Sequence, residues 1–322
     1  MKKIIVLTSG GDAPGMNAAI RAVVRSGHFY GLKVYGCQLG FQGLVEKKIF
    51  PLEPESVANC IQHGGTILQT GRYLNFLQKD VRTQCLDFLH SEKIDGIVVI
   101  GGNGSFKGAS LLSSEGGPAI IGIPGTIDND IPGTEYTIGF DTARNTALHA
   151  IDKIRDTASS HNRLFLVEVM GRSSGFLAVD VGLAGGAEFI LTPEFPFTMP
   201  ELASKIMKPR REKLSSIIVI AEADEPGRSI QMAKELDELT GLQYRVCILG
   251  HTQRGGSPTL LDRKVALSMG NLAVKGLIEG KSHKMTAIVR DELMLVDIPD
   301  PDHGSRVLLN KYLLELNDVL CS

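Results

Sequence analysis

Six short apolar runs, separated by stretches with a helical pattern, constrain the fold of this sequence more than any other feature. They lie at Ile4–Leu7, Ile97–Ile100, Ala119–Ile123, Leu164–Val167, Ile217–Ile220 and Val246–Leu249. Uninterrupted runs of this kind are typical of strands buried on both faces, as in a parallel sheet covered by helices. Between them, Thr142–Thr157 gathers its alanine and isoleucine side chains on one helical face. The alternation predicts a doubly wound α/β fold with a mostly parallel sheet, in a chain long enough for two closely packed lobes.

Composition and charge exclude several classes of protein. The net charge of −2 gives no reason to expect a polyanionic partner such as DNA or an anionic membrane surface. No apolar run approaches the ~18 residues of a membrane span, and no secretory cleavage site follows the first residues. The five cysteines are scattered and form no C-x-x-C pair, which argues against a disulfide framework and against a zinc site. We therefore expect a soluble cytoplasmic protein.

Two glycine-rich loops follow predicted strands and precede predicted helices. They are Thr8–Asn17 and Gly101–Ser105. Backbone N–H groups in such loops can face an anion at the helix N-terminus, and Ser105 can add a hydroxyl. Either loop could also be a tight turn without a ligand. Neither is the G-x-G-x-x-G of a dinucleotide site or the Gly-Lys-Ser/Thr of a P-loop, which argues against a nicotinamide dehydrogenase.

Carboxylates and basic residues follow other predicted strands. The loop Pro124–Asp130 carries Asp128 and Asp130 beside the hydroxyl of Thr126. A kinase needs a carboxylate to orient the acceptor hydroxyl and to take its proton, although Asp and Asn also form ordinary capping turns.

The arginines Arg163, Arg172 and Arg245 border predicted strands, and the loop Gly250–Pro258 follows the last one. Guanidinium groups suit bidentate phosphate recognition, whereas a lone arginine is usually a solvated surface group. We expect the strand-end arginines to face a ligand. His251 could act as a base, but a neutral hydrogen-bonding role is the simpler expectation.

Taken together, five of these loops resemble the bacterial ATP-dependent 6-phosphofructokinases. They occur in the family's order over essentially the whole chain, at Thr8–Asn17, Gly101–Ser105, Pro124–Asp130, Met170–Arg172 and Gly250–Pro258. The resemblance implies two similar doubly wound lobes with the active site between them. Residues 1–138 plus 252–301 would form the ATP-binding lobe, and residues 139–251 plus 302–322 the sugar-phosphate-binding lobe. It also implies an allosteric homotetramer whose active sites are shared between subunits, acting on MgATP and fructose 6-phosphate.

The resemblance further assigns roles to individual residues of this sequence. Asp128 would be the catalytic base, assisted by Thr126, Asp130, Arg172 and Gly11. Fructose 6-phosphate would be held by Thr126, Ile127, Asp128, Met170, Gly171, Arg172, Glu222, His251, Thr252, Gln253 and Arg254, with Arg163 and Arg245 reaching in from a neighbouring subunit. ATP would be held by Gly11, Arg72, Tyr73, Gly102, Asn103, Gly104 and Ser105. Glycine at positions 104 and 125, where the pyrophosphate-using branch has Asp and Lys, implies ATP as the donor.

One departure from the family pattern concerns the magnesium site. The usual loop is Gly-Gly-Asp-Gly-Ser, but this chain has Asn103 in place of the Asp that serves the metal. An amide lacks the negative charge, so we expect the rate of phosphoryl transfer to be about ten- to a thousandfold lower. Each factor of ten in rate corresponds to ~1.4 kcal/mol of activation free energy. The substitution could be tolerated because Asp130 or the ATP phosphates hold the metal. It could also be an inactivating change, or mark a catalytically impaired regulatory relative. Asn103-Gly104 is in addition a dipeptide prone to deamidation.

The expected effector site is also altered. The resemblance places Arg21, Arg25, Arg155, Glu188, Arg211 and Lys213 at the site where ADP or phosphoenolpyruvate binds in the family. Pro54, Glu55 and Ser215 stand where Arg, Tyr and His are usual. We therefore expect weak or absent activation by ADP. The spacing of four between Arg21 and Arg25 would also fit one exposed helix face.

Overall fold

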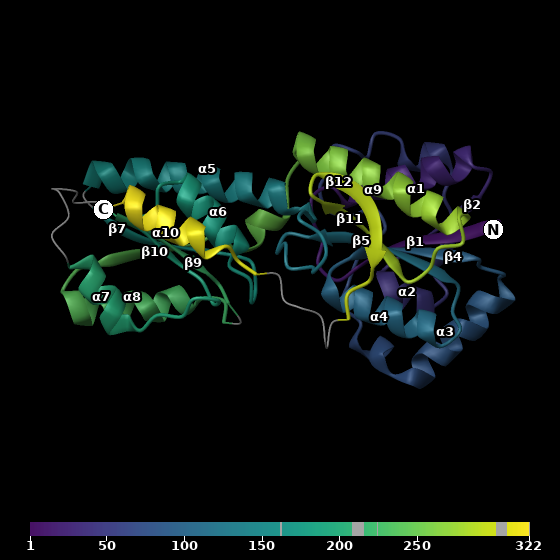
Figure 1. The fold of residues 1–322 in the computed structure, drawn as a ribbon, viewed down its shortest axis with the longest axis horizontal. Coiled ribbons are helices and arrows are strands. Elements are labelled where there is room, and N and C mark those ends of the chain that lie inside the picture. Colours follow the sequence, from purple (N-terminus) through teal and green to yellow (C-terminus); the bar gives the residue numbers. More distant parts are fainter. Residues whose placement is uncertain (162, 208–215, 224, 301–307, 322) are drawn as a thin grey trace. The chain divides into compact units, whose positions relative to one another are not determined.

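The chain folds into two compact units, described here in a computed structural model that covers residues 1–161, 163–207, 216–223, 225–300 and 308–321. Unit 1 comprises Met1–Thr142 and Arg254–Val307, and unit 2 comprises Ala143–Gln253 and Leu308–Ser322. In each unit a sheet lies between helices that cover both of its faces (Figure 1). The structure is therefore α/β in both units, as the alternation of patterns predicts.

The sheet of unit 1 has parallel strands at its centre and antiparallel pairs at its edges. Its order in the described residues is β12-β11-β5-β4-β1-β2-β3, with β6 paired to β5. The antiparallel pairs are β11 with β12 and β2 with β3. The strands are β1 (Lys3–Ser9), β2 (Lys33–Cys37), β3 (Ile49–Pro51), β4 (Gly96–Gly101), β5 (Ala119–Thr126), β6 (Ile138–Gly139), β11 (Lys284–Val289) and β12 (Glu292–Asp297).

Helices cover both faces of this sheet. One face carries α1 (Met16–Phe29) and α9 (Leu260–Ile278), and the other carries α2 (Gly40–Val45), α3 (Lys79–Ser91) and α4 (Asn103–Ser114) (Figure 1). The short 3-10 helices η1 (Pro54–Val57) and η2 (Leu74–Leu77) lie in the connections, and η3 (Gly250–Arg254) spans the unit boundary. Because both faces are covered, Ile97, Val98, Val99 and Ile100 are all fully buried.

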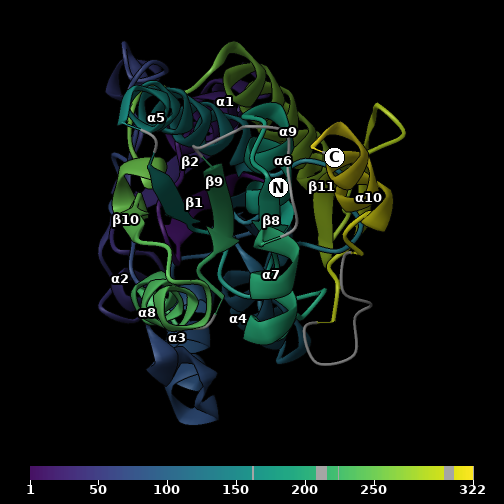
Figure 2. The ribbon, with the colours of Figure 1, turned by 90° about the vertical axis from the view of Figure 1, so that its left-hand side faces the viewer.

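Unit 2 has a smaller sheet, which is entirely parallel. Its described strands are β7 (Leu164–Val169), β8 (Phe189–Leu191), β9 (Ser216–Ala221) and β10 (Tyr244–Ile248), in the order β10-β7-β9-β8. Figure 2 shows its strands between two groups of helices. One group is α5 (Phe140–His161), α6 (Phe176–Ala184) and α10 (Lys311–Leu320), and the other is α7 (Met199–Ile206) and α8 (Arg228–Thr240).

The predicted elements are found in the structure. All six apolar runs lie in strands, with only Leu249 one residue past the end of β10, and Thr142–Thr157 lies within α5. Among the described residues, no helix is both long and apolar enough to cross a membrane. The apolar pattern thus identified all six strands, but β10 lies at the edge of its sheet and is only partly buried, unlike the expected strand covered on both faces.

The register of the parallel strands brings three strand ends of unit 1 to one edge. Ser9 at the end of β1 pairs with Gly101 at the end of β4, and Gly101 pairs with Pro124 in β5. A buried hydrogen bond, 2.9 Å from Ser105 Oγ to the Ser9 carbonyl oxygen, ties the start of α4 to the end of β1. The loops that follow these strands therefore lie at adjacent positions on the sheet.

A half-buried ion pair supports the same unit on the side of α3. Arg82 on α3 is 4% exposed and donates to both carboxylate oxygens of Glu115, at 2.8 and 2.6 Å. Its third contact is a 2.8 Å hydrogen bond from Nη1 to the carbonyl oxygen of Phe76 in η2. The hydrogen bonds from Arg82 lower the pKa of the Glu115 carboxyl. One guanidinium thus joins α3, the end of α4 and η2.

Replacing Glu115 by glutamine should destabilise the protein in a pH-dependent way. At pH 7, Glu115→Gln should lower the stability by about 1.5–3 kcal/mol, because a charge-assisted bond to a buried guanidinium is lost. The folded pKa lies below the unfolded value near 4.3, so this contribution is present above about pH 4.3 and is lost as the pH falls. The melting temperatures of variant and wild type should therefore converge on acidification. A difference that stays constant at every pH would contradict this account.

Candidate active site

The loop after β1 is held close to a second segment by backbone hydrogen bonds. Gly10, in a left-handed conformation (φ 89°), donates its N–H to the Gly71 carbonyl at 3.2 Å, and its own carbonyl accepts from Thr70 Oγ1 at 3.1 Å. A Cβ at Gly11 would lie 2.4 Å from Arg254 Nη1, which donates to the Asp12 carbonyl at 3.1 Å. A side chain at position 11 would therefore displace the Arg254 guanidinium from this contact.

The loop after β4 ends as the N-terminus of α4. A Cβ at Gly101 would lie 2.5 Å from Ser105 Oγ and 2.6 Å from the Ser9 carbonyl oxygen, so this position also needs glycine. Gly102 precedes the helix, and Asn103 is its first residue. Gly104 is exposed, and a Cβ added there would meet no neighbouring group within 4 Å. The free N–H groups of this helix end favour an anion. The Ser105 hydroxyl proton, in contrast, is committed to Ser9.

The loop after β5 holds Asp128 in a buried turn. Asp128 is 5% exposed, and its N–H donates to Thr126 Oγ1 at 3.2 Å. Asn129 has a left-handed backbone (φ 49°), and its Oδ1 accepts from Thr137 N and Oγ1 at 2.9 and 3.2 Å. Thr137 Oγ1 also donates to the Thr126 carbonyl. The turn is therefore fixed by side chains that flank Asp128.

Asn103 and Asp130 come together across two of these loops. Asn103 Nδ2 donates to Asp130 Oδ2 at 2.9 Å and to the Asp130 carbonyl oxygen at 3.4 Å. In the described ranges, no three His, Cys, Asp or Glu side chains form a group that could enclose a metal ion. The carboxylates of Asp128 and Asp130 nevertheless suit Mg²⁺, which commonly takes one or two carboxylates and completes its shell with phosphates and waters.

A residue that the sequence analysis did not single out positions the segment before Arg72. Asn17, 1% exposed in the first turn of α1, donates 3.1 Å bonds to the carbonyls of His63 and Gly64 and accepts a 2.8 Å bond from Ile67 N. Between η1 and η2 the chain has no helix or strand, so such bonds take the place of regular structure. Arg72 is exposed, and Tyr73 is partly buried. Asn17 was recognisable only as the end of a glycine loop, since its partners lie about 50 residues away.

In unit 2, Met170, Gly171 and Arg172 form a strained turn after β7. Gly171 has φ 134°, and a Cβ there would lie 2.5 Å from the Ser174 carbonyl oxygen. Arg172 has φ 52°, its N–H donates to Glu222 Oε1 at 3.1 Å, and its side chain is exposed. Non-glycine residues with positive φ are uncommon and often occur at functional sites. The structure thus brings together Arg172 and Glu222, which the sequence analysis assigned to one ligand.

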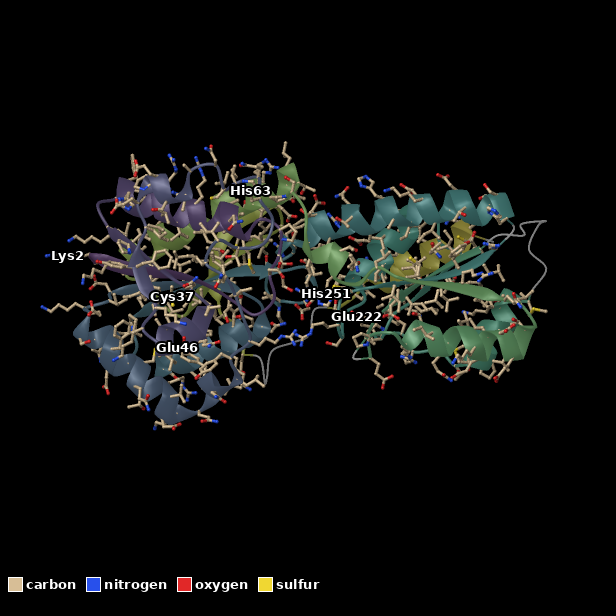
Figure 3. All side chains as sticks on the ribbon, turned by 180° about the vertical axis from the view of Figure 1, so that it is seen from behind. Lys2, Cys37, Glu46, His63, Glu222 and His251 are labelled. Atoms are coloured by element: carbon tan, nitrogen blue, oxygen red, sulfur yellow. The ribbon has the colours of Figure 1, made fainter. Side chains whose placement is uncertain are left out.

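The third part of unit 2 follows β10. Gln253 is fully buried and accepts a 3.4 Å bond from Met170 N while donating to the Gly250 carbonyl at 3.0 Å. His251 and Thr252 are exposed beside it. Figure 3 labels His251 and Glu222, which lie at the same end of this sheet because both follow the carboxyl ends of parallel strands.

Arg163 and Arg245 do not join this group within one chain. Arg163 precedes β7, whereas Arg172 follows it, and the six residues of β7 at about 3.3 Å each separate them by roughly 20 Å. Arg245 is the second residue of β10 and pairs with Phe165 near the same end as Arg163. Both side chains are exposed.

The expected effector residues divide between the two units. Arg21 and Arg25 lie on α1 of unit 1. In unit 2, Arg155 donates to the carbonyls of Gly185 and Gly186 and lies 3.7 Å from Glu188 Oε1. Glu188 is 4% exposed and accepts from Ile217 N at 2.6 Å. Arg211 and Lys213 lie outside the described residues.

Comparison with known proteins gives consistent matches over nearly the whole chain. The family model described as phosphofructokinase matches residues 3–277. An ATP-dependent 6-phosphofructokinase of Coxiella burnetii is 58% identical over 322 residues, covering 100% of this chain and 99% of that protein. The ATP-dependent 6-phosphofructokinase 1 of Thermus thermophilus is 49% identical, covering 99% of each.

A solved structure shows the same fold. The phosphofructokinase of Saccharomyces cerevisiae matches with a TM-score of 0.84 and 37% identity, over 92% of this chain. The present chain spans 45% of the length of that larger protein.

Proposed function

The chain belongs to the phosphofructokinase family, and we propose that it transfers the γ-phosphoryl group of ATP to the 1-hydroxyl of fructose 6-phosphate, giving fructose 1,6-bisphosphate. The names of its full-length relatives support this reaction. The observation that carries it is the arrangement in unit 1, where the glycine loops after β1 and β4 adjoin the buried turn of Asp128. Such strand ends are where ligands bind in open α/β sheets.

Asp128 serves as the base in this proposal. The sugar oxygen attacks the γ-phosphorus, the bond from that phosphorus to the bridging oxygen breaks, and ADP leaves. The proton of the 1-hydroxyl passes to the Asp128 carboxylate. Thr126 holds the turn, through its contact with Asp128 N, and Arg172 stabilises negative charge on the transferred group.

ATP is held by backbone groups and by cations of unit 1. Gly11 and the segment Gly102–Gly104 present N–H groups at the N-terminus of α4 and beside it, and Ser105, Arg72 and Tyr73 complete the site. Asp130, beside Asn103, would hold Mg²⁺ together with the phosphates, and the bound ion would offset phosphate charge.

Fructose 6-phosphate is held mainly by unit 2 in this proposal. The proposed residues are Met170, Gly171, Arg172, Glu222, His251, Thr252 and Gln253, together with Arg254, Thr126 and Ile127. The 6-phosphate requires cations, and Arg163 and Arg245 of a neighbouring subunit supply them. Their position at the opposite end of β7 from Arg172 supports such an exchange between chains. We therefore propose a cytoplasmic homotetramer.

A second candidate function rests on Asn103. An amide at this position removes one negative charge that could hold Mg²⁺, which would slow phosphoryl transfer. If the deficit were complete, the chain would be a ligand-binding regulatory relative. The proposed base, Asp128, is present and buried in its turn, which favours the active enzyme over the regulatory relative.

Activity and its dependence on Asp128 test the proposed reaction directly. In a coupled assay with MgATP and fructose 6-phosphate, the wild type should form fructose 1,6-bisphosphate. Asp128→Asn should lower kcat by about 10²–10⁴-fold, because the base is lost while the turn is kept. A wild type that binds both substrates without turnover would favour the regulatory relative.

Donor choice can be tested at Gly104. Gly104→Asp should fold normally, because a Cβ there has open space and an acidic residue suits the first turn of a helix. It should nevertheless raise KM for ATP by about tenfold or more, since its charge would oppose the nucleotide phosphates. Gly104→Ala adds the Cβ without the charge and should have a much smaller effect. Equal KM values for the two variants would argue against phosphates at this helix end.

Sharing of sites between subunits can be tested by mixing inactive variants. Asp128→Asn and Arg245→Ala should each be impaired as homotetramers. When the two are unfolded and refolded together, some sites combine an intact Asp128 with an intact Arg245 from another chain, so part of the activity should return. If the mixture is no more active than the separate variants, each site is built from one chain.

A further inference from the structure

The amide of Asn103 has its orientation fixed by two acceptors. Its Nδ2 lies 2.9 Å from Asp130 Oδ2 and 3.4 Å from the Asp130 carbonyl oxygen. Both of these atoms accept hydrogen bonds, and only the NH₂ side of the amide can donate. The reverse orientation would place the amide oxygen against two other oxygens. The NH₂ group of Asn103 must therefore face Asp130.

This orientation directs the amide oxygen away from the Asp130 carboxylate. A cation bound by that carboxylate could take Asn103 Oδ1 as a ligand only if the amide turned over. That rotation would break the 2.9 Å bond and bring an oxygen against the Asp130 carbonyl. Because Asn103 is the first residue of α4, its backbone is fixed by the helix and by the adjoining strand end.

From this geometry we infer that Asn103 is a positioning residue for Asp130 rather than a ligand of the metal. This role differs from the one expected from the resemblance, in which position 103 serves the magnesium, and it rests on the proposed function. An aspartate at position 103 would set two carboxylates at hydrogen-bond distance, and their repulsion would be relieved by a cation between them. Asn103 instead donates to Asp130 and holds that side chain in place before any metal nucleotide arrives. Pre-ordering of this kind lowers the cost of binding.

Removal of the Asn103 side chain separates the two roles. The probe is Mn²⁺ together with an excess of the β,γ-imido analogue of ATP, and the quantity measured is the affinity for Mn²⁺ by electron paramagnetic resonance. If Asn103 only positions Asp130, Asn103→Ala should bind Mn²⁺ at most about tenfold more weakly than the wild type, because the pre-ordering of one side chain is lost but no ligand is. Asn103→Asp should bind it more tightly than either. In metal-free Asn103→Ala, hydrogen exchange at residues 128–131 should be faster than in the metal-free wild type. Addition of Mn²⁺ with the analogue should slow it again.

Asn271→Ala is the matched control. It removes another amide donor of the same unit, the 2.9 Å bond from Asn271 Nδ2 to Ser26 Oγ, and leaves the strand ends untouched. It should change neither the affinity for Mn²⁺ nor the exchange at 128–131. A loss of Mn²⁺ affinity in Asn103→Ala well beyond about tenfold, more than the ordering of one side chain can explain, would overturn the inference. Unchanged hydrogen exchange at residues 128–131 in metal-free Asn103→Ala would also overturn it.

A failure of the proposed function would give a different experimental result from a failure of this inference. A wild type that does not bind the nucleotide analogue would contradict the proposed reaction. The exchange comparison in metal-free protein would still decide whether Asn103 positions Asp130.

Discussion

The parallel pairing of β4 with both β1 and β5 is the constraint on which the rest of unit 1 depends. It fixes Ser9, Gly101 and Pro124 side by side. The loops that follow these residues therefore lie at one edge of the sheet. The bond from the Ser105 hydroxyl to the Ser9 carbonyl oxygen closes this edge from the side of α4. Its geometry leaves no room for a Cβ at Gly101, which is why glycine occurs where the chain leaves β4.

Side chains, more than regular structure, set the positions of the loops. Asn129 and Thr137 fix the turn of Asp128, and Asn17 fixes the segment that leads to Arg72. Arg82 adds a charged bridge from α3 to η2 and Glu115. Buried amides and guanidinium groups of this kind are costly unless each polar atom finds a partner, so they tie specific segments together instead of merely filling space. Unit 2 uses the same means, since Gln253 and Glu222 each accept a bond from the turn Met170–Arg172.

Much of this arrangement could be predicted from the sequence, because local patterns encode it. Runs such as Ile97–Ile100 are apolar throughout because both faces of the strand are covered, and that signal is visible without a structure. Strands of only three residues such as β3 and β8 are too short to carry such a signal. The contact of Asn103 with Asp130 could not be predicted either, since it joins residues 27 positions apart through the register of two strands. The sequence predicted a weakened metal ligand at position 103. In the structure, the NH₂ group of Asn103 faces Asp130 and donates to it.

Hydrogen exchange with each substrate bound separately would test most directly whether the ligands occupy the predicted loops. With the β,γ-imido analogue of ATP and Mg²⁺, we expect slower exchange at residues 10–12, 72–73 and 102–105. With fructose 6-phosphate alone, we expect slower exchange at residues 170–172 and 251–254. Protection of these two sets by their respective ligands would support the assignment of the nucleotide and the sugar phosphate to these loops. Nucleotide protection confined to other segments, or none at all, would contradict it.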